Sequence, residues 1–420
     1  MVKSNHISPI YLQIFCVMGF FCLLGIFSCH QSDTSGYQIT TFTDVIPYAE
    51  SQLGRTDFEV PYLRYPYTTG FLGKWQTAGS EQWCSGFHPG CLWLLLEATS
   101  NHDWLAKAAR RTAGLTEQQH TTGTHDVGFI IFTSFSQGYR LTKNDSYKGV
   151  ILQAAHSLAT RYNPVVGCIR SWDQGTFPVI VDGLMNLEIL FWAAKHGGGA
   201  AFAEMAHNHA LRTMSDHVRS DGSTYHVVEY NPQSGEVLKK YTHQGFSDES
   251  TWSRGQAWAI AGFTQAYGET GDDRLLETAR KVARYFIDNL PPDQIPYWDF
   301  DLPEHETRLY RDSSAAAIAA FGLLELSALE PEAVESSYFK DRAVALLSSL
   351  TFHYLTVGTT NRGLLLHAAY NVPSGDYYAQ DSAAIWGDYY YLASILKVIP
   401  GLSDPVPETG SEKSHKSRTD

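Results

Sequence analysis

Hydrophobic positions recur with a helical period along almost the whole chain, with little of the strict alternation that is typical of strands. Capping residues support several of the helix starts, because Asn101, Asp145 and Asp272 can each accept a bond from a first-turn N–H. The pattern predicts roughly twelve helices, over residues 41–53, 84–99, 101–115, 126–141, 145–162, 177–195, 199–218, 250–270, 272–290, 312–329, 333–350 and 380–398.

These segments alternate in character along the chain. Those beginning near residues 101, 145, 199, 272 and 333 carry Lys, Arg and Glu on one face. Those beginning near residues 84, 126, 177, 250, 312 and 380 are apolar nearly all round, as expected for helices buried on every side. Buried and amphipathic helices in turn indicate an inner and an outer ring. The predicted fold class is therefore all-α, an (α/α)6 barrel of six helical hairpins, with a two-layer helical solenoid as the alternative.

Links from an outer to an inner helix are long, and they are rich in Gly, Pro, Trp, Tyr and His. They cover residues 55–83, 163–176, 219–249, 291–311 and 356–379. All of them reach the end of the barrel where the inner helices begin, and long ordered loops commonly carry function. Residues 222–245 predict a small β-hairpin that turns at residues 232–235.

Composition narrows the choice of partner and compartment. The 420 residues carry a net charge of −13, which argues against a nucleic-acid partner, since that would require a basic face. Only Cys84, Cys91 and Cys168 follow residue 29, which is too few for a disulfide scaffold. No Cys or His spacing typical of a metal site is present, and no cofactor is predicted.

The N-terminus is typical of an export signal. Lys3 precedes an apolar run over residues 10–27, and residues 25–29, Gly-Ile-Phe-Ser-Cys, resemble a bacterial lipobox ending at Cys29. We expect a lipoprotein signal peptide over residues 1–29, with Cys29 lipidated, and a periplasmic or outer-membrane-associated protein; plain secretion and an uncleaved anchor are the alternatives. The remaining divisions are a tether over residues 30–36, a catalytic domain over 37–400 and a disordered tail over 401–420.

The apolar stretch from Phe177 to Trp192 contains one carboxylate, Asp182, near its start. An Asp in such surroundings is either a helix cap or a group placed for chemistry. The other inner helices also open on polar and aromatic residues, among them Asp126. These residues would lie together at the end of the barrel where the inner helices begin. A site lined by aromatic rings with few charges can bind sugar rings, and two acids can act as general acid and base at a glycosidic bond.

Four motifs make the prediction of a carbohydrate-active enzyme more specific: HDVGF at 125–129, VDGLMNL at 181–187, WSRGQAWAIAGF at 252–263 and IWGDYYYL at 385–392. Together they resemble the unsaturated glucuronyl hydrolases of glycoside hydrolase family 88, over about residues 37–400. RGQAW favours this family over its rhamnogalacturonyl relatives. The resemblance implies the same barrel, and it implies hydration of the C4=C5 vinyl ether of an unsaturated uronyl residue left by a polysaccharide lyase.

The resemblance also implies roles for individual residues. Asp182 would protonate C4 and assist the water that attacks C5, and its pKa would be raised by its apolar surroundings. Asp126 would hold substrate hydroxyls and tune Asp182. Arg254 would bind the uronate carboxylate, or else pair with Asp248 or Glu249. The remaining substrate-binding residues would be His125, His226 and Gln244, with stacking walls from Trp83, Phe87, Trp172 and Trp258, the last of which is equally compatible with core packing.

The expected partner is an unsaturated uronic-acid oligosaccharide. Three other functions stay open from the sequence: an unsaturated rhamnogalacturonyl hydrolase, a glycan-binding lipoprotein without catalysis, and an inverting glycosidase that acts on saturated chains. The presence of both Asp126 and Asp182 argues against the non-catalytic reading. The sequence does not name the parent polysaccharide.

Overall fold

The computed structural model describes residues 36–70, 72–303 and 310–401. The predicted signal peptide with Cys29, almost all of the tether and all but one residue of the predicted tail fall outside the described residues. Contacts divide the chain into residues 1–33 and residues 34–420, and everything below concerns the second unit.

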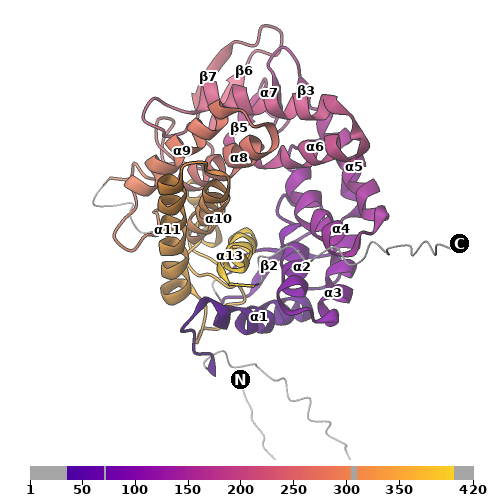
Figure 1. The fold of residues 1–420 in the computed structure, drawn as a ribbon, viewed down its shortest axis with the longest axis vertical. Helices are drawn as coiled ribbons and strands as arrows, with labels where there is room; N and C mark the ends of the chain where they lie inside the picture. Colours follow the sequence, from indigo (N-terminus) through magenta and orange to yellow (C-terminus); the bar gives the residue numbers. More distant parts are fainter. Residues whose placement is uncertain (1–35, 71, 304–309, 402–420) are drawn as a thin grey trace, which may run out of the picture. The chain divides into compact units, whose positions relative to one another are not determined.

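Six helical segments form the inner ring (Figure 1). Each contacts the next, and the last contacts the first, so the ring is closed. In chain order they are α2 (Phe87–Thr99), the π-helical η4 (Gly128–Ser136) continued by α4 (Gln137–Thr142), the 3-10 helix η5 (Val181–Asn186) followed by α6 (Glu188–Ala193), α8 (Ser253–Thr270), α10 (Ser313–Leu329) and α13 (Ile385–Val398).

Six further helices pack against the outside of this ring. They are α1 (Val45–Glu59), α3 (His102–Ala113), α5 (Asp145–Ala159), α7 (Ala200–His217), α9 (Asp273–Asp288) and α11 (Ala333–Ser349). The inner helices are buried on nearly all faces, whereas α3 and α9 bury one face only. The predicted (α/α)6 barrel and its alternation of buried and amphipathic helices are therefore confirmed.

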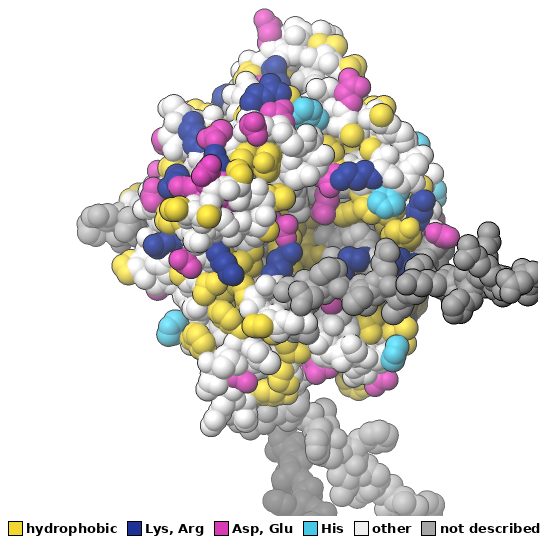
Figure 2. All heavy atoms as spheres, in the orientation of Figure 1, with side chains coloured by type: hydrophobic (Ala, Val, Ile, Leu, Met, Phe, Trp, Pro, Cys, Tyr) yellow, Lys and Arg dark blue, Asp and Glu magenta, His cyan; other side chains and the backbone are white. Residues whose placement is uncertain are grey.

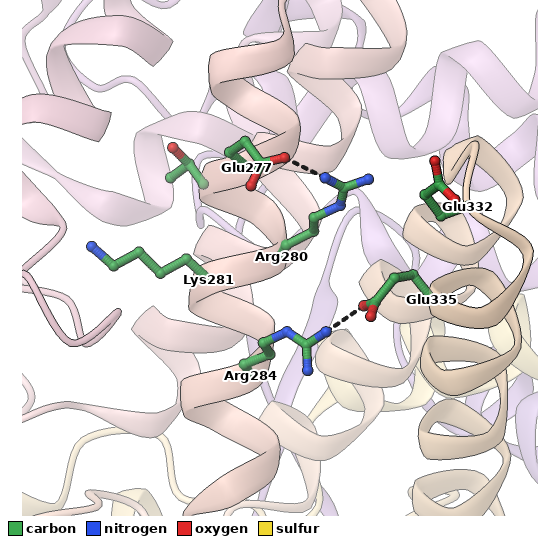
Figure 3. Close-up of a pocket in the computed structure, with 7 residues that line it drawn as sticks. Glu277, Arg280, Lys281, Arg284, Glu332 and Glu335 are labelled. Carbon is green, nitrogen blue, oxygen red and sulfur yellow. Dashed lines mark hydrogen bonds and ion pairs between the residues drawn. The ribbon is translucent and has the colours of Figure 1, made fainter.

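Ion pairs join neighbouring outer elements on their solvent side. Arg284 of α9 pairs with Glu335 of α11, and Arg280 donates from Nε to Glu330 over 2.8 Å. Arg280, Arg284 and Glu335 line a surface pocket between α9 and α11 (Figure 3), whereas Glu330 is buried at the end of α10. Acidic and basic side chains are intermingled over the upper left of the space-filling view (Figure 2). This surface pocket is separate from the residues predicted to carry chemistry.

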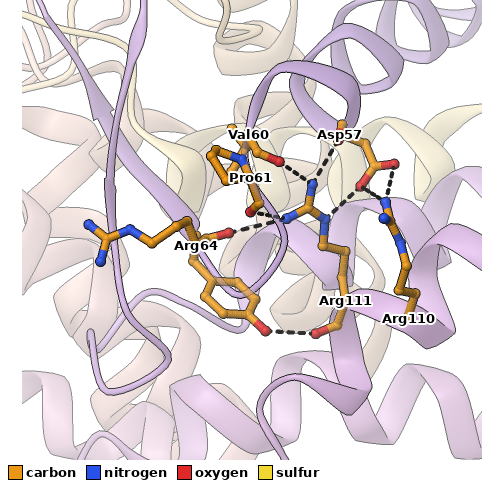
Figure 4. A network of polar contacts seen from close by, with 7 residues as sticks. Asp57, Val60, Pro61, Arg64, Arg110 and Arg111 are labelled. Carbon is orange, nitrogen blue, oxygen red and sulfur yellow. Dashed lines mark hydrogen bonds and ion pairs between the residues drawn. The ribbon is translucent and has the colours of Figure 1, made fainter.

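A buried arginine ties α1 to α3 (Figure 4). Arg111 is 1% exposed, and its Nε donates to Asp57 over 2.6 Å. Its other nitrogens donate to main-chain oxygens, including those of Asp57 and Val60 at 2.7 Å. A charge buried this deeply is tolerated because it is paired and its donors are used.

Three small sheets lie between the helices: β1 (Tyr65–Thr69) with β2 (Trp75–Ala78), β3 (Tyr162–Asn163) with β4 (Cys168–Ile169), and β5 (Pro178–Ile180) with β6 (Val227–Tyr230) and β7 (Val237–Tyr241), all antiparallel. Strands β6 and β7 are the predicted hairpin. Short helical turns complete the chain: η2 (Phe42–Asp44), η3 (Thr116–His120), η6 (Ala194–Gly198), η7 (Leu350–Tyr354), η8 (Val372–Ser374) and α12 (Tyr377–Gln380).

The predicted helix over residues 177–195 is wrong in its first half. The segment begins as strand β5, continues as 3-10 helix η5 and becomes α-helical only from Glu188. Pro178 and the β-branched run Val179–Val181 disfavour a helix and favour a strand, and the hairpin offers β5 a partner. Apolar character alone did not distinguish a buried strand from a buried helix.

Two smaller outcomes concern caps and cysteines. Asn101 and Asp272 cap α3 and α9 as predicted, whereas α5 is capped by Asn144 instead of Asp145. Cys84, Cys91 and Cys168 are buried free thiols.

Among the residues that the structure describes, no helix is both long and apolar enough to cross a membrane.

Candidate active site

Strand register places Asp182 beside His226. Ile180 of β5 pairs with Val227 of β6, and the N–H of Val181 donates to the carbonyl of His226 over 3.1 Å. The chain then turns into η5, so Asp182 lies two residues beyond the last paired residue of β5. Its Oδ2 is 3.8 Å from Nε2 of His226. The sheet thus brings together two residues that are distant in sequence.

Asp182 is 9% exposed, and its Oδ2 has no hydrogen-bond partner among the described residues. It is not a helix cap, since η5 has no side-chain cap. Burial raises the pKa of Asp182 to about 7, while Arg254 opposes the rise. At neutral pH a substantial share of this carboxyl group is therefore protonated, which a general acid requires.

The second acid, Asp126, lies in the loop before η4. Its Oδ2 accepts from the hydroxyl of Thr124 over 2.6 Å, and its Oδ1 is 3.3 Å from Nε2 of His125. The N–H of Phe129 donates to Asn186 over 2.8 Å and joins η4 to η5. The charge of Asp126 contributes to the raised pKa of Asp182, so the two predicted acids face one site.

His226 is neutral, and its tautomer follows from its contacts. Burial, with the neighbouring His243, holds the pKa of His226 well below its usual range. Its Nδ1 accepts from the main-chain N–H groups of His243 and Gln244, over 3.2 and 3.3 Å. The ring proton is therefore on Nε2, which faces Asp182. The side chain of Gln244 donates to the carbonyl of Tyr370 over 2.8 Å.

Arg254 has a partner that the sequence did not predict. It is 1% exposed, and its Nη1 donates to Asp312 at the start of α10 over 2.7 Å, not to Asp248 or Glu249. The same guanidinium also donates to the carbonyls of Ala369 and Tyr370. In this structure Arg254 thus anchors the 356–379 loop, and its positive charge lies close enough to influence Asp182.

The predicted aromatic walls divide into two groups. Trp83 and Trp172 are half-buried, and Trp172 contacts the ring of His243 with centroids 5.7 Å apart. Phe87 and Trp258, in contrast, have no exposed surface. Both contact the ring of Phe129, at centroid distances of 5.5 and 5.2 Å. The stacking prediction is therefore corrected for these two, which support the wall from behind; for Trp258 this was the stated alternative.

Three further residues belong to the site and were given no individual role from the sequence. Tyr370 receives a bond from the indole N–H of Trp83 over 3.3 Å and contacts Trp386. Trp252 packs on His226 with centroids 4.5 Å apart. Asp312 binds Arg254 across 58 residues of sequence. Two of them carried a local signal: Trp252 opens the motif that contains Arg254, and Asp312 opens an inner helix, whereas Tyr370 carried none.

The chemistry available is that of a protonatable buried acid, a neutral imidazole N–H and a second carboxylate. In residues 36–70, 72–303 and 310–401, no group of three or more His, Cys, Asp or Glu side chains is arranged to hold a metal ion. Two buried N–H groups lie near Asp182: the indole N–H of Trp258, which lowers the pKa of this carboxyl group against the effect of burial, and Nε2 of His226 at 3.8 Å.

Comparison with known proteins places this site in context. Residues 66–400 match the model of Glycosyl Hydrolase Family 88. An unsaturated glucuronyl hydrolase of Formosa agariphila is 40% identical over 327 residues, which cover 76% of this chain and 80% of the relative. An unsaturated chondroitin disaccharide hydrolase of Streptococcus agalactiae is 30% identical over 374 residues, 86% of this chain and 92% of the relative.

The likeness extends to three dimensions. A crystal structure of an unsaturated glucuronyl hydrolase specific for heparin has a TM-score of 0.81 and 35% identity, covering 85% of this chain and 96% of that one. Both the family match and the relatives span the segments that carry Asp126, Asp182 and Arg254. The chain therefore belongs to glycosyl hydrolase family 88.

Proposed function

We propose that this enzyme hydrates the C4=C5 bond of a 4-deoxy-hex-4-enuronic acid at the non-reducing end of an oligosaccharide, with Asp182 as the acid. The observation that carries the proposal is the placement of Asp182: it is buried, its Oδ2 has no hydrogen-bond partner among the described residues and lies 3.8 Å from Nε2 of His226, and this burial raises its pKa to about 7. A carboxyl group with that pKa is protonated often enough at neutral pH to give up a proton, and its anion is basic enough to take one back.

The steps balance as follows. The Asp182 carboxyl group donates its proton to C4, and the π electrons form the new C–H bond, leaving positive charge shared by C5 and the ring oxygen. Water adds to C5 and gives a proton to the Asp182 carboxylate, which restores the acid. The hemiketal then opens to a ketone at C5 and a hemiacetal at C1, which releases the rest of the chain as an alcohol.

Neighbouring groups can stabilise the two charged species of the reaction, the Asp182 carboxylate and the cation shared by C5 and the ring oxygen. His226 presents an N–H toward Asp182, so it can stabilise the carboxylate formed after proton transfer. The carboxyl group of Asp126, held by Thr124 and His125, can accept bonds from substrate hydroxyls and stabilise developing positive charge at C5. Trp83 and Trp172 supply the half-exposed rings against which sugar faces stack.

The direct test follows the conjugated enoate in the ultraviolet. Disaccharides made by a polysaccharide lyase should lose this absorbance with the native enzyme. Asp182→Asn should lower kcat by about a thousandfold, within the range known for removal of a general acid. Glu335→Gln, the same chemical change on the outer ring, is the control and should leave the rate unchanged.

Three results would change the assignment of function or of the acid. Tight binding of the unsaturated disaccharide with no loss of absorbance in the native protein would support a glycan-binding function. Release of saturated sugars from an uncut polymer would support an ordinary glycosidase. Activity of Asp182→Asn within tenfold of native would mean that another residue donates the proton.

We propose that the substrates are unsaturated disaccharides of glycosaminoglycans. The support is the names of similar proteins, one specific for heparin and one for chondroitin disaccharides. A panel of lyase products from chondroitin, heparin, hyaluronan, ulvan and gellan, compared by kcat/KM, tests this. A preference for the ulvan or gellan product would contradict it.

We also propose that the protein is exported and attached to lipid at Cys29. The support lies in the sequence alone: Lys3, the apolar residues 10–27 and the lipobox-like residues 25–29. Metabolic labelling of the protein in a bacterial host with a fatty-acid probe should mark the native protein and not Cys29→Ala. Equal labelling of both would exclude attachment at this residue.

A further inference from the structure

The two acids of the site lie on neighbouring inner segments that cross closely at Gly128 and Asn186. The π-helix η4 begins at Gly128, two residues after Asp126, and the 3-10 helix η5 contains Asp182 and ends at Asn186. A Cβ atom on Gly128 would lie 2.5 Å from Oδ1 and 2.8 Å from Cα of Asn186. Non-bonded atoms do not approach so closely, so a residue without a side chain at position 128 allows the two segments to touch.

The side chain of Asn186 caps η4 from the neighbouring segment. The N-cap residue of η4 is Val127, whose apolar side chain cannot accept a hydrogen bond. The first N–H groups of a helix have no acceptor within that helix. The N–H of Phe129 instead donates to Oδ1 of Asn186 over 2.8 Å, and the bond is buried. Because an unpaired buried N–H is unfavourable, this bond holds the first turn of η4 against the end of η5.

Short connections link this bond to both acids. The N–H of Ile130, the residue after Phe129, donates to the carbonyl of Asp126 over 2.9 Å. On the other side, Asp182 and Asn186 lie four residues apart in one 3-10 helix. The bond between Asn186 and Phe129 therefore fixes the main chain of Asp126 relative to that of Asp182.

The burial of Asn186 indicates that this bond is the reason for an amide at the position. Asn186 is 1% exposed, and its Nδ2 has no hydrogen-bond partner among the described residues. A buried amide nitrogen without a partner is unfavourable compared with an apolar side chain of similar size. The acceptor that Oδ1 provides for Phe129 offsets this cost.

We propose that Asn186 is a positioning residue for the reaction: together with Gly128, it fixes the distance between the carboxyl groups of Asp126 and Asp182. The inference rests on the proposed function, because that distance matters only to a reaction that uses both acids on one sugar. If η4 moved away from η5, Asp126 would hold the substrate hydroxyls in a different place. The C4 atom would then no longer lie where Asp182 delivers its proton.

Two substitutions at residue 186 separate the hydrogen bond from the volume of the side chain. Asn186→Leu has a similar volume but no acceptor for Phe129, so kcat should fall about 100-fold. Asn186→Asp keeps an acceptor oxygen in either protonation state, so its kcat should stay within about tenfold of native. The control is Asn144→Leu, which removes the same kind of acceptor from the N-cap of the outer helix α5 and should keep the native rate.

A double-mutant cycle with Asp126→Asn separates positioning from a loss of stability. If Asn186 acts by placing the carboxyl group of Asp126, its substitution should matter little once that group is absent. We expect Asn186→Leu to lower kcat by about threefold or less in the Asp126→Asn background. A merely structural residue would lower the melting temperature and reduce kcat by the same factor in both backgrounds. That result, or an Asn186→Asp variant as slow as Asn186→Leu, would overturn the inference.

A second cycle needs no turnover. Carbon-13 NMR follows the pKa of the Asp182 carboxyl group, which the charge of Asp126 helps to raise. Asp126→Asn should decrease this pKa in the otherwise native protein and should change it less in the Asn186→Leu protein. An equal decrease in both proteins would contradict a role for Asn186 in holding the two acids together.

The two cycles also keep this inference distinct from the proposed function. A native enzyme that consumes no unsaturated disaccharide would exclude the proposed function, and the NMR cycle would still decide whether Asn186 sets the distance between the acids. If Asn186→Leu does not fold, Asn186→Ser replaces it in both cycles. The serine hydroxyl is too short to reach the N–H of Phe129, so the same outcomes are expected.

Discussion

At the scale of single residues, the site depends on the different surroundings of two carboxyl groups, those of Asp182 and Asp126. Asp182 is buried with an unpartnered oxygen, whereas Asp126 is bonded to Thr124 and lies beside His125. The charge of Asp126 adds to the effect of burial on Asp182. One carboxyl group can thus be protonated while its neighbour accepts hydrogen bonds.

This difference predicts a pH dependence. Activity needs protonated Asp182, so kcat/KM should fall as pH rises through about 7. In Asp126→Asn the nearby negative charge is absent, so the pKa of Asp182 should decrease. Carbon-13 NMR of the Asp182 carboxyl group measures this directly in a variant that turns over slowly. An unchanged or higher pKa in Asp126→Asn would show that the two groups are not coupled.

The sequence predicted the two acids, His125, His226 and Gln244 through motif resemblance, and these residues do gather at one place. It could not predict the partner of Arg254, because Asp312 is 58 residues away and a local pattern carries no information on that pairing. Nor could it separate exposed from buried aromatics: Phe87 and Trp83 are equally plausible as a wall until packing shows which one faces outward.

At the scale of elements, the 356–379 loop is held to the barrel by side chains from other segments. Arg254 of α8 binds two of its carbonyls, Gln244 binds one of them, and Trp83 binds the hydroxyl of Tyr370. Arg254 in turn is fixed by Asp312. The position of Tyr370 therefore depends on three loops and two inner helices.

Arg254→Lys should loosen this loop while keeping a positive charge near Asp312. A lysine has a single nitrogen and cannot serve Asp312 and both carbonyls in the same geometry. We expect kcat/KM to fall about 10- to 100-fold through misplacement of site residues. Steady-state kinetics on the unsaturated disaccharide measure the loss. The control is Arg284→Lys, in the outer pair with Glu335, and a loss of equal size there would contradict the loop argument.

Helix boundaries were mostly predictable because caps and amphipathic faces are local properties. The exception is the segment before Glu188, where a buried strand and a buried helix share the same apolar composition. Its strand character depends on β6, which lies 47 residues further along, as the pairing of Ile180 with Val227 shows. The fold of this segment was therefore decided by tertiary pairing.

At the scale of the whole molecule, several buried groups have pKa values that shift in opposite directions. Burial raises the pKa of Glu188 and Asp182 to about 7 and that of Asp388 to about 8. Burial lowers the pKa of His88 and His209 to about 3. The acids weaken the folded state as pH rises, and the histidines weaken it as pH falls.

The directions of these pKa shifts predict how the free energy of unfolding depends on pH. Above about pH 6.5 His88 and His209 are neutral in both folded and unfolded chains, so they no longer contribute, whereas Glu188, Asp182 and Asp388 still do. The unfolded chain has already released the protons of these acids while the folded chain still holds part of them, so stability should decrease between pH 6.5 and 8. Thermal unfolding across this range measures it. Glu188→Gln, distant from the site, should make the decrease smaller; an unchanged slope would exclude Glu188 as a contributor.

The strand that leads into Asp182 has a consequence for how such enzymes diversify. Because β5 pairs with β6, Asp182 and the imidazole of His226 are attached to the same small sheet. A bend of that sheet moves both side chains together. The far tip of the β6–β7 hairpin is bound instead to Asn163 and to Arg212 of α7, at the end of the hairpin away from His226. Changes at that tip should therefore leave the spacing between Asp182 and His226 unaltered.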